Sequence, residues 1–513
     1  MDIHEIMSLN FIIHTLLFSS FILLLVLLIF IKKSGKKSWS SEKLPPSPPK
    51  FPIIGHLLYL VGGQPHYALR RLAQKYGHIL LLQFGEVPMV VISSREAAEQ
   101  VLKVQDPACA DRHDSILTRI MWYDYKDMAF SPYNDYWKQM RKICVMEMLS
   151  AKNVRSFEFI RQDEVSRLVE SIREDNCKAI NVTEKIAAFT NSVTCRVAFG
   201  KVVKDRDFFV DMFKKMATMV GGFELADLFP SSKLLHVFSW NKYKLLKMHR
   251  KLDRFLDHIL EEHELKQSGE FDGEDFVDAL LRIKESGDQL QFPVTNVSIK
   301  AILADVFSAG SETSSTTFNW VMTELMRNPR VMEKVQAEVR QAFNSYKGNK
   351  VSDVLTTLTY LKLVIKETFR LHPPIALLPR AFRDESVVVD GYSMPLKCRT
   401  VINIWSLGRD PEYWHEPEVF QPERFENNPI DFLGNNFEFI PFGAGRRICP
   451  GQNFGLANIE LPLAQLLYHF DWKLPKGITH QNIDMSEASG LVISRKNDLF
   501  LIPELYSCPS TQQ

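Results

Sequence analysis

The most continuous apolar stretch of the chain lies near its start. Almost every residue from Phe11 to Ile31 is apolar, and a helix of that length, rising about 1.5 Å per residue, crosses a bilayer core of about 30 Å. Residues 1–10 lack the basic start of a secretory signal, and no small-residue cleavage site follows. We predict a transmembrane anchor at 11–31 rather than a buried core helix, because a helix that is apolar all round seldom opens a soluble domain.

A basic and proline-rich segment follows from 32 to 52. Lysines stand at positions 32, 33, 36 and 37, and by the positive-inside rule they place the following chain in the cytoplasm and residues 1–10 in the lumen. The prolines between Leu44 and Pro52 fix the backbone and stop a helix. We expect an extended, semi-rigid hinge that sets the pose of the domain on the membrane. Binding of this stretch to another protein is the alternative.

From 53 to 513, apolar and polar positions alternate without long low-complexity runs or repeats. Length alone favours about three domains, but the hinge is the only visible linker, so we predict one large domain. Helical patterns run from about 295 to 327 and from about 454 to 468, where Pro462 is expected to bend the helix. With 45% hydrophobic residues and 35 Phe, this domain can surround an apolar pocket.

Charge and cysteine usage narrow the function. The 62 basic and 61 acidic residues are interspersed and leave a net charge of +1, which gives no electrostatic basis for a nucleic-acid partner. The 7 cysteines are scattered, odd in number and form no CxxC pair, which indicates a reducing compartment and argues against zinc. The glycosylation sequons at Asn181 and Asn296 matter only if the domain faces a secretory lumen.

The strongest local signal is the glycine-rich loop from Phe442 to Gly451, which carries Cys449 just before the second predicted helix. Glycines allow positive φ angles and a close approach to a flat ligand. A thiolate here would be stabilised by backbone N–H groups, the helix N-terminus and a metal cation, and Arg447 could pair with an anionic group. A turn around a buried structural cysteine is the simpler explanation of the loop taken alone.

Polar groups also interrupt the apolar helix at 295–327. Glu312 and Thr313 lie in the segment Ala309–Ser314, where a glycine and a Ser/Thr cluster are expected to weaken helical hydrogen bonding. A carboxylate and a hydroxyl could relay protons there. A plain buried helix, in which the hydroxyls bond to preceding carbonyls, is the alternative.

Two further pairs each share a helix face. Glu367 and Arg370 are three residues apart, and Trp137 and Arg141 are four apart. Taken alone, both pairs also fit ordinary solvated helices.

The loop pattern FxxGxRxCxG resembles the haem-binding loop of the cytochrome P450 family, and as a ten-residue motif it is highly specific. The resemblance implies that Cys449 is the axial ligand of a haem iron and that Phe442 lies against the cofactor. It also implies that Arg447, together with the WxxxR pair Trp137 and Arg141, meets the haem propionates. Thiolate ligation donates electron density that favours O–O cleavage.

Two other motifs follow the family's order and spacing. The segment around Thr313 resembles the oxygen-activation motif, with Glu312 as its adjacent acid. The sequence PERF at 422–425 resembles the motif that brings Arg424 into a buried network with Glu367 and Arg370, which supports the cysteine loop.

The resemblance covers essentially the whole chain and is closest to plant A-type members that hydroxylate terpenes and alkaloids. Segments 84–88, 131–137 and 466–472 carry that likeness. It implies a mainly helical fold with a small β region at 53–513, haem b, and electrons from NADPH through a membrane-bound NADPH–cytochrome P450 reductase. It also implies a single-pass protein of the endoplasmic reticulum membrane with a cytoplasmic catalytic domain.

Two departures limit what can be said of the substrate. The segment 375–378 is one residue shorter than is common in relatives and lacks a proline, and Arg112-His113-Asp114 stands where relatives often have Arg-Pro. The candidate pocket residues are Ile302, Val306, Ala309, Ile375, Ala376, Leu377 and Leu491.

We interpret the chain as a monooxygenase that inserts one atom of O2 into a small apolar substrate, a sesqui- or diterpenoid in the first place and an alkaloid in the second. A haem-thiolate isomerase or dehydratase is a further alternative, but such members generally lose the threonine that Thr313 represents. A tethered scaffold with a relic haem loop is a third, and the intact motif set argues against it.

Overall fold

The computed structural model describes residues 19–20, 43–203, 212, 215–216, 219, 224–237, 239–265, 273–287, 290–348, 350–383, 387–396 and 398–506. The anchor predicted at 11–31 lies outside this part of the chain except for Ser19 and Ser20, and no helix among the described residues is long and apolar enough to cross a membrane. Of the predicted hinge, residues 43–50 form neither helix nor strand, as proline favours. The carbonyl of Pro46 accepts the N–H of Leu81 at 2.9 Å.

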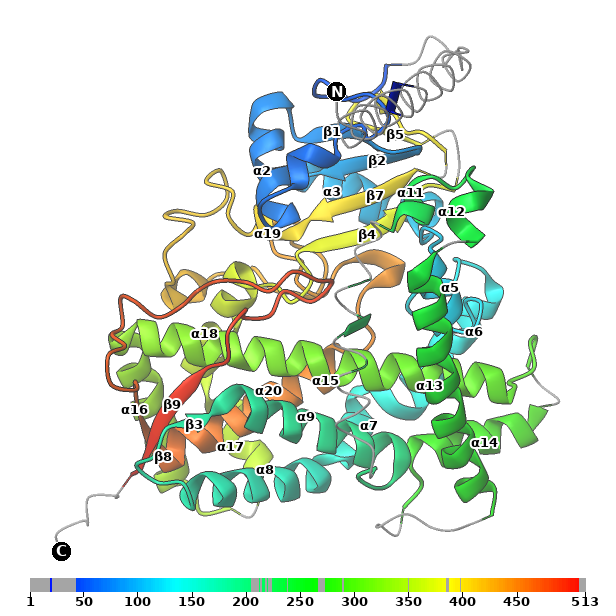
Figure 1. Ribbon diagram of the computed structural model, residues 1–513. Coiled ribbons are helices and arrows are strands. Elements are labelled where there is room, and N and C mark those ends of the chain that lie inside the picture. Colours follow the sequence, from blue (N-terminus) through cyan, green and yellow to red (C-terminus); the bar gives the residue numbers. More distant parts are fainter. Residues whose placement is uncertain are drawn as a thin grey trace, which may run out of the picture.

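Helices make up most of the described chain (Figure 1), which confirms the predicted fold class of a mainly helical domain with a small β region. The helices are α2 Pro65–Tyr76, α3 Arg95–Glu99, α4 Asp106–Cys109, α5 Ile116–Met121, α6 Asp135–Cys144, α7 Ala151–Ser156, α8 Glu158–Arg173, α9 Val182–Phe199, α11 Leu225–Leu228, α12 Lys233–Val237, α13 Trp240–Glu264, α14 Phe276–Glu285, α15 Asn296–Arg327, α16 Pro329–Ser345, α17 Val351–Thr357, α18 Thr359–Leu371, α19 Ile404–Leu407 and α20 Gln452–His469.

Helix α15 runs through the middle of the helical body (Figure 1). The Thr295 side chain begins it by accepting the N–H of Ser298 at 3.2 Å, which satisfies one of the free donors of a helix start. Helices α9, α13, α18 and α20 pack around it. Because neighbouring helices surround it, α15 is buried over most of its length, including many of its polar side chains.

The strands form one four-stranded sheet and two smaller ones. The large sheet has the order β1-β2-β7-β4, with β2 and β7 parallel and the other neighbours antiparallel. The turn between β1 and β2 requires Gly85, whose φ is +59° and where an added Cβ would lie 2.5 Å from the Leu228 carbonyl oxygen. The strands are β1 Ile79–Phe84, β2 Val87–Ile92, β3 Ile180–Asn181, β4 Leu377–Ala381, β5 Val388–Val389, β6 Tyr392–Ser393, β7 Arg399–Asn403, β8 Phe470–Lys473 and β9 Phe500–Leu505.

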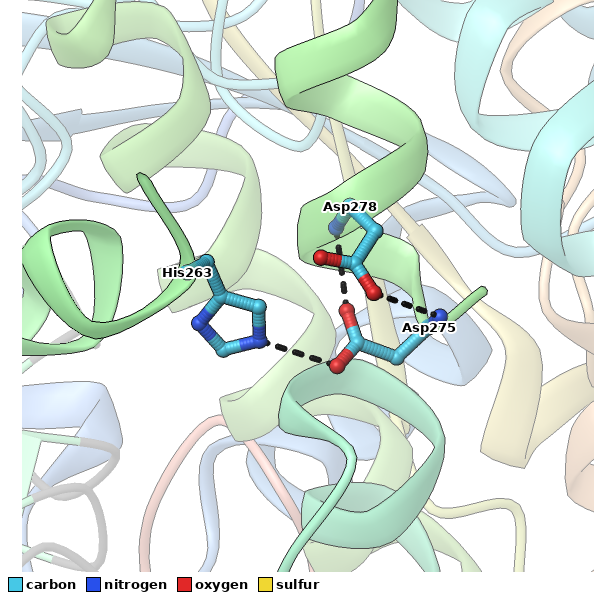
Figure 2. A group of neighbouring side chains, drawn as sticks. All are labelled: His263, Asp275 and Asp278. Carbon is cyan, nitrogen blue, oxygen red and sulfur yellow. Dashed lines mark hydrogen bonds and ion pairs between the residues drawn. The ribbon is translucent and has the colours of Figure 1, made fainter. Parts of the chain in front are cut away.

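A buried ionic group joins the end of α13 to the start of α14 (Figure 2). His263 Nδ1 contacts the Ile259 carbonyl at 2.7 Å and Nε2 contacts Asp275 Oδ2 at 2.9 Å. Asp275 and Asp278 cap α14 by exchanging backbone N–H bonds. Although ligand atoms of the three side chains lie within 4.8 Å of one another, these hydrogen bonds account for the grouping. Both ring nitrogens of His263 face acceptors, which favours the charged imidazolium.

This group predicts a pH-dependent contribution to stability. Burial opposes the charge on His263, but the hydrogen bond and the charge of Asp275 outweigh it and raise the pKa of His263 above 6.5. This contribution is therefore fully present below pH 6.5 and is lost as the pH rises through the higher folded-state pKa.

We expect His263→Gln to lower the thermal unfolding midpoint most at about pH 6 and progressively less at higher pH. His258→Gln is the matched control, since His258 lies on the same helix and is 67% exposed. A loss of stability in His263→Gln that grows with pH would contradict the assignment.

Candidate active site

The loop that carries Cys449 is a tight turn in front of α20. Gly445 has φ +68°, and an added Cβ would lie 2.1 Å from the Leu102 carbonyl oxygen, so only glycine fits. The Cys449 amide donates to the Phe442 carbonyl at 2.9 Å, and the Arg446 amide donates to Asp106 Oδ2 at 2.8 Å. These bonds close the loop and direct the Cys449 side chain into a cavity below α15.

That cavity brings together most of the residues that the sequence singled out. It is bounded by α15, α6, the cysteine loop and the start of β4, and it is largely apolar. The sequence-predicted residues that line it are Trp137, Arg141, Val306, Ala309, Thr313, Ile375, Phe442, Arg447 and Cys449. Ala309 is exposed although it lies in the middle of a buried helix, because its surface faces the cavity.

Three guanidinium groups line the same cavity. Burial lowers the pKa of Arg447 to about 9, and the nearby charge of Arg112 adds to the effect. Burial likewise lowers the pKa of Arg112 to about 10 and lowers that of Arg141. The indole ring of Trp137 stacks below Arg447, 4.2 Å from the guanidinium carbon. Buried cations need anionic partners, so this edge of the cavity suits a ligand that carries carboxylates.

The thiol of Cys449, by contrast, needs a positively charged partner when it is ionised. Burial raises the pKa of the Cys449 thiol, whereas the N–H of Gly451 and the charge of Arg141 act in the other direction. A metal cation would stabilise the thiolate in this apolar setting. Haem, which the resemblance of the cysteine loop implies, carries both a metal and carboxylates and therefore fits the residues present.

Arg112 was not predicted as a site residue. Its Nε donates to the Ala129 carbonyl at 2.9 Å, and its Nη1 donates to the Pro379 carbonyl. In the sequence it stands beside His113 and Asp114, a polar run typical of an exposed loop. Contacts with β4 and with the chain before α6 bury it, and sequence spacing does not reveal such contacts.

Thr313 presents its hydroxyl at the cavity wall. Its Oγ1 donates to the Ala309 carbonyl at 2.7 Å, and Ser314 Oγ donates to the Gly310 carbonyl at 3.2 Å. Helix α15 is continuous through 309–314, and these hydroxyls bond to carbonyls of the preceding turn, as in the alternative of a plain buried helix. Glu312 is half-buried and does not line the cavity.

Four of the predicted pocket residues also lie away from this cavity. Ile302 is fully buried in the helical core. Leu377 packs toward α2, since neighbouring Leu378 faces the cavity and side chains alternate along a strand. Ala376 packs against Trp405 and Ile493, and Leu491 lies half-buried in a late loop.

Glu367 forms the buried network that the motifs implied. Both of its carboxylate oxygens accept bonds from Arg370 at 2.7 Å, and Arg424 Nε donates to Oε1 at 2.9 Å. Glu367 and Arg370 are completely buried. Arg370 also donates to the carbonyls of Gly408 and Pro417, so the network ties α18 to the chain that leads to the cysteine loop.

Comparison with known proteins agrees with this site. The family model described as Cytochrome P450 matches residues 45–502. Cytochrome P450 71D95 from Mentha spicata is 56% identical over 477 residues, which is 93% of this chain and 96% of that protein. Premnaspirodiene oxygenase from Hyoscyamus muticus is 50% identical over 493 residues, 95% and 98% of the two chains. A solved zebrafish cytochrome P450 with abiraterone shares the fold, with a TM-score of 0.72 at 23% identity, over 86% of this chain and 100% of that one.

The fold, the cysteine loop and these matches define a haem-thiolate monooxygenase, an oxidoreductase whose haem is held by a cysteine thiolate. The chain belongs to the cytochrome P450 family, and its high-identity plant relatives place it among the plant A-type members. The predictions of family, enzyme class and cofactor are thus confirmed. The roles of the individual residues stay predictions.

Proposed function

We propose that this enzyme hydroxylates or oxidises an apolar terpenoid of sesqui- or diterpene size in plant specialised metabolism. The observation that carries the proposal is the apolar wall beside Cys449, which includes Val306, Ala309, Ile375 and Leu378 and offers few hydrogen-bond partners to a substrate. The name of one relative, premnaspirodiene oxygenase, supports a hydrocarbon-like substrate.

The proposed reaction combines the substrate, O2, NADPH and a proton to give the hydroxylated product, water and NADP+. Haem, bound through Cys449, supplies the reductive activation of O2, with electrons from NADPH through a cytochrome P450 reductase. Arg447, Arg141 and Trp137 are proposed to hold the propionates, and Arg112, which the sequence did not single out, joins them because it lines the same cavity.

Thr313 is proposed to hold the water that passes protons into the cavity. Its hydroxyl can donate to the Ala309 carbonyl and still accept from a water. Glu312 does not line the cavity. Its proposed role is therefore indirect, and it supplies protons to Thr313 through water.

Thr313→Ala should retain haem and substrate binding and continue to consume NADPH, but it should lose much of its product yield and release more hydrogen peroxide. General acid–base contributions are roughly 100-fold or more, so the loss is easily measured as product and peroxide per NADPH. Thr317→Ala is the matched control, since it removes a hydroxyl one turn further along α15 that does not line the cavity. If Thr313→Ala makes as much product per NADPH as the wild type and releases no extra peroxide, the proposed role of Thr313 in proton delivery is wrong.

The substrate proposal is tested by incubating microsomes that contain the full chain and a reductase with a panel of terpene hydrocarbons and alkaloids under 18O2. Labelled terpenoid products support the proposal, and labelled alkaloid products alone would replace it with the alkaloid alternative. Product formed without O2 or reductase would instead establish an isomerase or dehydratase.

We further propose that the chain is anchored once in the endoplasmic reticulum membrane with its catalytic domain in the cytoplasm. The apolar stretch at 11–31 and the lysines after it support this. The sequon at Asn296 is a sensitive reporter because Asn296 is exposed, whereas the Asn181 side chain caps α9 and donates to Asp498.

We expect neither Asn296 nor Asn181 to be glycosylated in native membranes. The measurement is the mass of the protein before and after glycosidase treatment. The domain redirected to the lumen by a secretory signal is the positive control. A glycosidase-sensitive mass shift in the native chain would overturn the orientation.

A further inference from the structure

An irregular segment, Asp127 to Ser131, crosses between α15 and the cysteine loop. Its carbonyl oxygens accept hydrogen bonds from three of the four side chains proposed to hold the haem propionates. The bonds run from Trp137 Nε1 to Met128 at 2.9 Å, from Arg447 Nη1 to Met128 at 3.3 Å, from Arg447 Nη2 to Ser131, and from Arg112 Nε to Ala129 at 2.9 Å. This one stretch of backbone therefore sets the direction of two guanidinium groups and one indole ring.

The same segment is fastened to α15 by one carboxylate. Asp305 Oδ2 accepts the N–H of Met128 at 2.7 Å and that of Ala129 at 3.1 Å. Asp305 is 4% exposed, lines the cavity and precedes Thr313 by eight residues on the same helix. Within the segment, Asp127 Oδ2 accepts the N–H of Phe130 at 2.7 Å.

We propose that Asp305 is a positioning residue for the cofactor. By holding the amides of Met128 and Ala129 against α15, it fixes the carbonyl oxygens that orient the Arg112 and Arg447 guanidinium groups toward the proposed propionate site, and the Met128 carbonyl that holds the Trp137 ring in place. The inference rests on the proposed propionate roles and names the group on which they depend. A single helix, α15, then carries both Asp305, which positions the cofactor, and Thr313, which delivers protons.

The charge and burial around Asp305 indicate which substitution at this position preserves its hydrogen bonds. Burial raises the pKa of Asp305 well above its usual range, and the charge of Asp127 adds to this, while the two amides act in the other direction. Burial also raises the pKa of Asp127 to about 7. Asn at position 305 keeps an acceptor oxygen without the charge, whereas Leu keeps the size and removes the acceptor.

The first test measures the rate of haem release from the full-length protein into excess apomyoglobin. Asp305→Leu should release haem about tenfold faster or more, because two buried N–H donors lose their acceptor, and Asp305→Asn should stay within about twofold of wild type. Glu324→Met is the matched control, since Glu324 is a buried carboxylate of α15 that binds His372 and does not line the cavity. Release from Asp305→Leu no faster than from wild type overturns the proposal.

The second test separates positioning from general weakening of the fold. Protein expressed without haem is reconstituted with haem or with its dimethyl ester, which carries no propionate charge. Asp305→Leu should release haem much faster than the wild type does, but it should release the ester at nearly the wild-type rate. An equal acceleration for haem and ester overturns the positioning role. If the far-UV circular dichroism of Asp305→Leu differs from that of the wild type, Asp305→Thr, which keeps one acceptor, replaces it. The same difference between haem and ester is then expected, but it should be smaller. Failure of the wild type to bind haem at all would refute the proposed function rather than this inference.

Discussion

The constraint on which the site depends is the burial of positive charge around an apolar cavity. Burial lowers the pKa of Arg112, Arg141 and Arg447 there, and the nearby carboxylate of Asp127 opposes this only in part for Arg112 and Arg447. Backbone carbonyls satisfy part of their hydrogen bonding, but carbonyl dipoles do not replace a counter-charge. A bound haem would supply that counter-charge through its two carboxylates, and its iron would do the same for the proposed Cys449 thiolate. Cofactor binding and stability of this region are therefore coupled.

Two scaffolds hold these groups in place. Behind the cysteine loop, Glu367 binds Arg370, with which it is completely buried, and Arg424, whose side chain is nearly so. Such a network adds little net stability compared with apolar packing. Removing one of its members, however, leaves a buried charge without a partner, and this cost favours a single geometry. In front of the cavity, α15 carries Asp305, Ala309 and Thr313 along one wall. The cofactor edge and the proposed proton route thus share one rigid element.

Sequence reasoning succeeded where the chemistry is local. The helix that begins at Thr295, the turn that delivers Cys449 and the helical faces of Trp137 and Arg141 follow from residue type and spacing, and the motifs implied the family. It failed where long-range packing decides. Leu377 was chosen instead of Leu378 because strand register was not known. Arg112 and Asp305 were missed because the roles proposed for them arise from contacts with Ala129, which is 17 and 176 residues away in the sequence.

All of the proposed chemistry requires Cys449 to be the thiolate ligand of a haem held in this cavity. The most direct measurement is the reduced, CO-bound difference spectrum of the full-length protein and of Cys449→Ala, with Cys177→Ser as the control because Cys177 is an exposed free cysteine. We expect a thiolate-type absorption in the wild type and in Cys177→Ser and none in Cys449→Ala. A thiolate-type spectrum that persists in Cys449→Ala would contradict the claim.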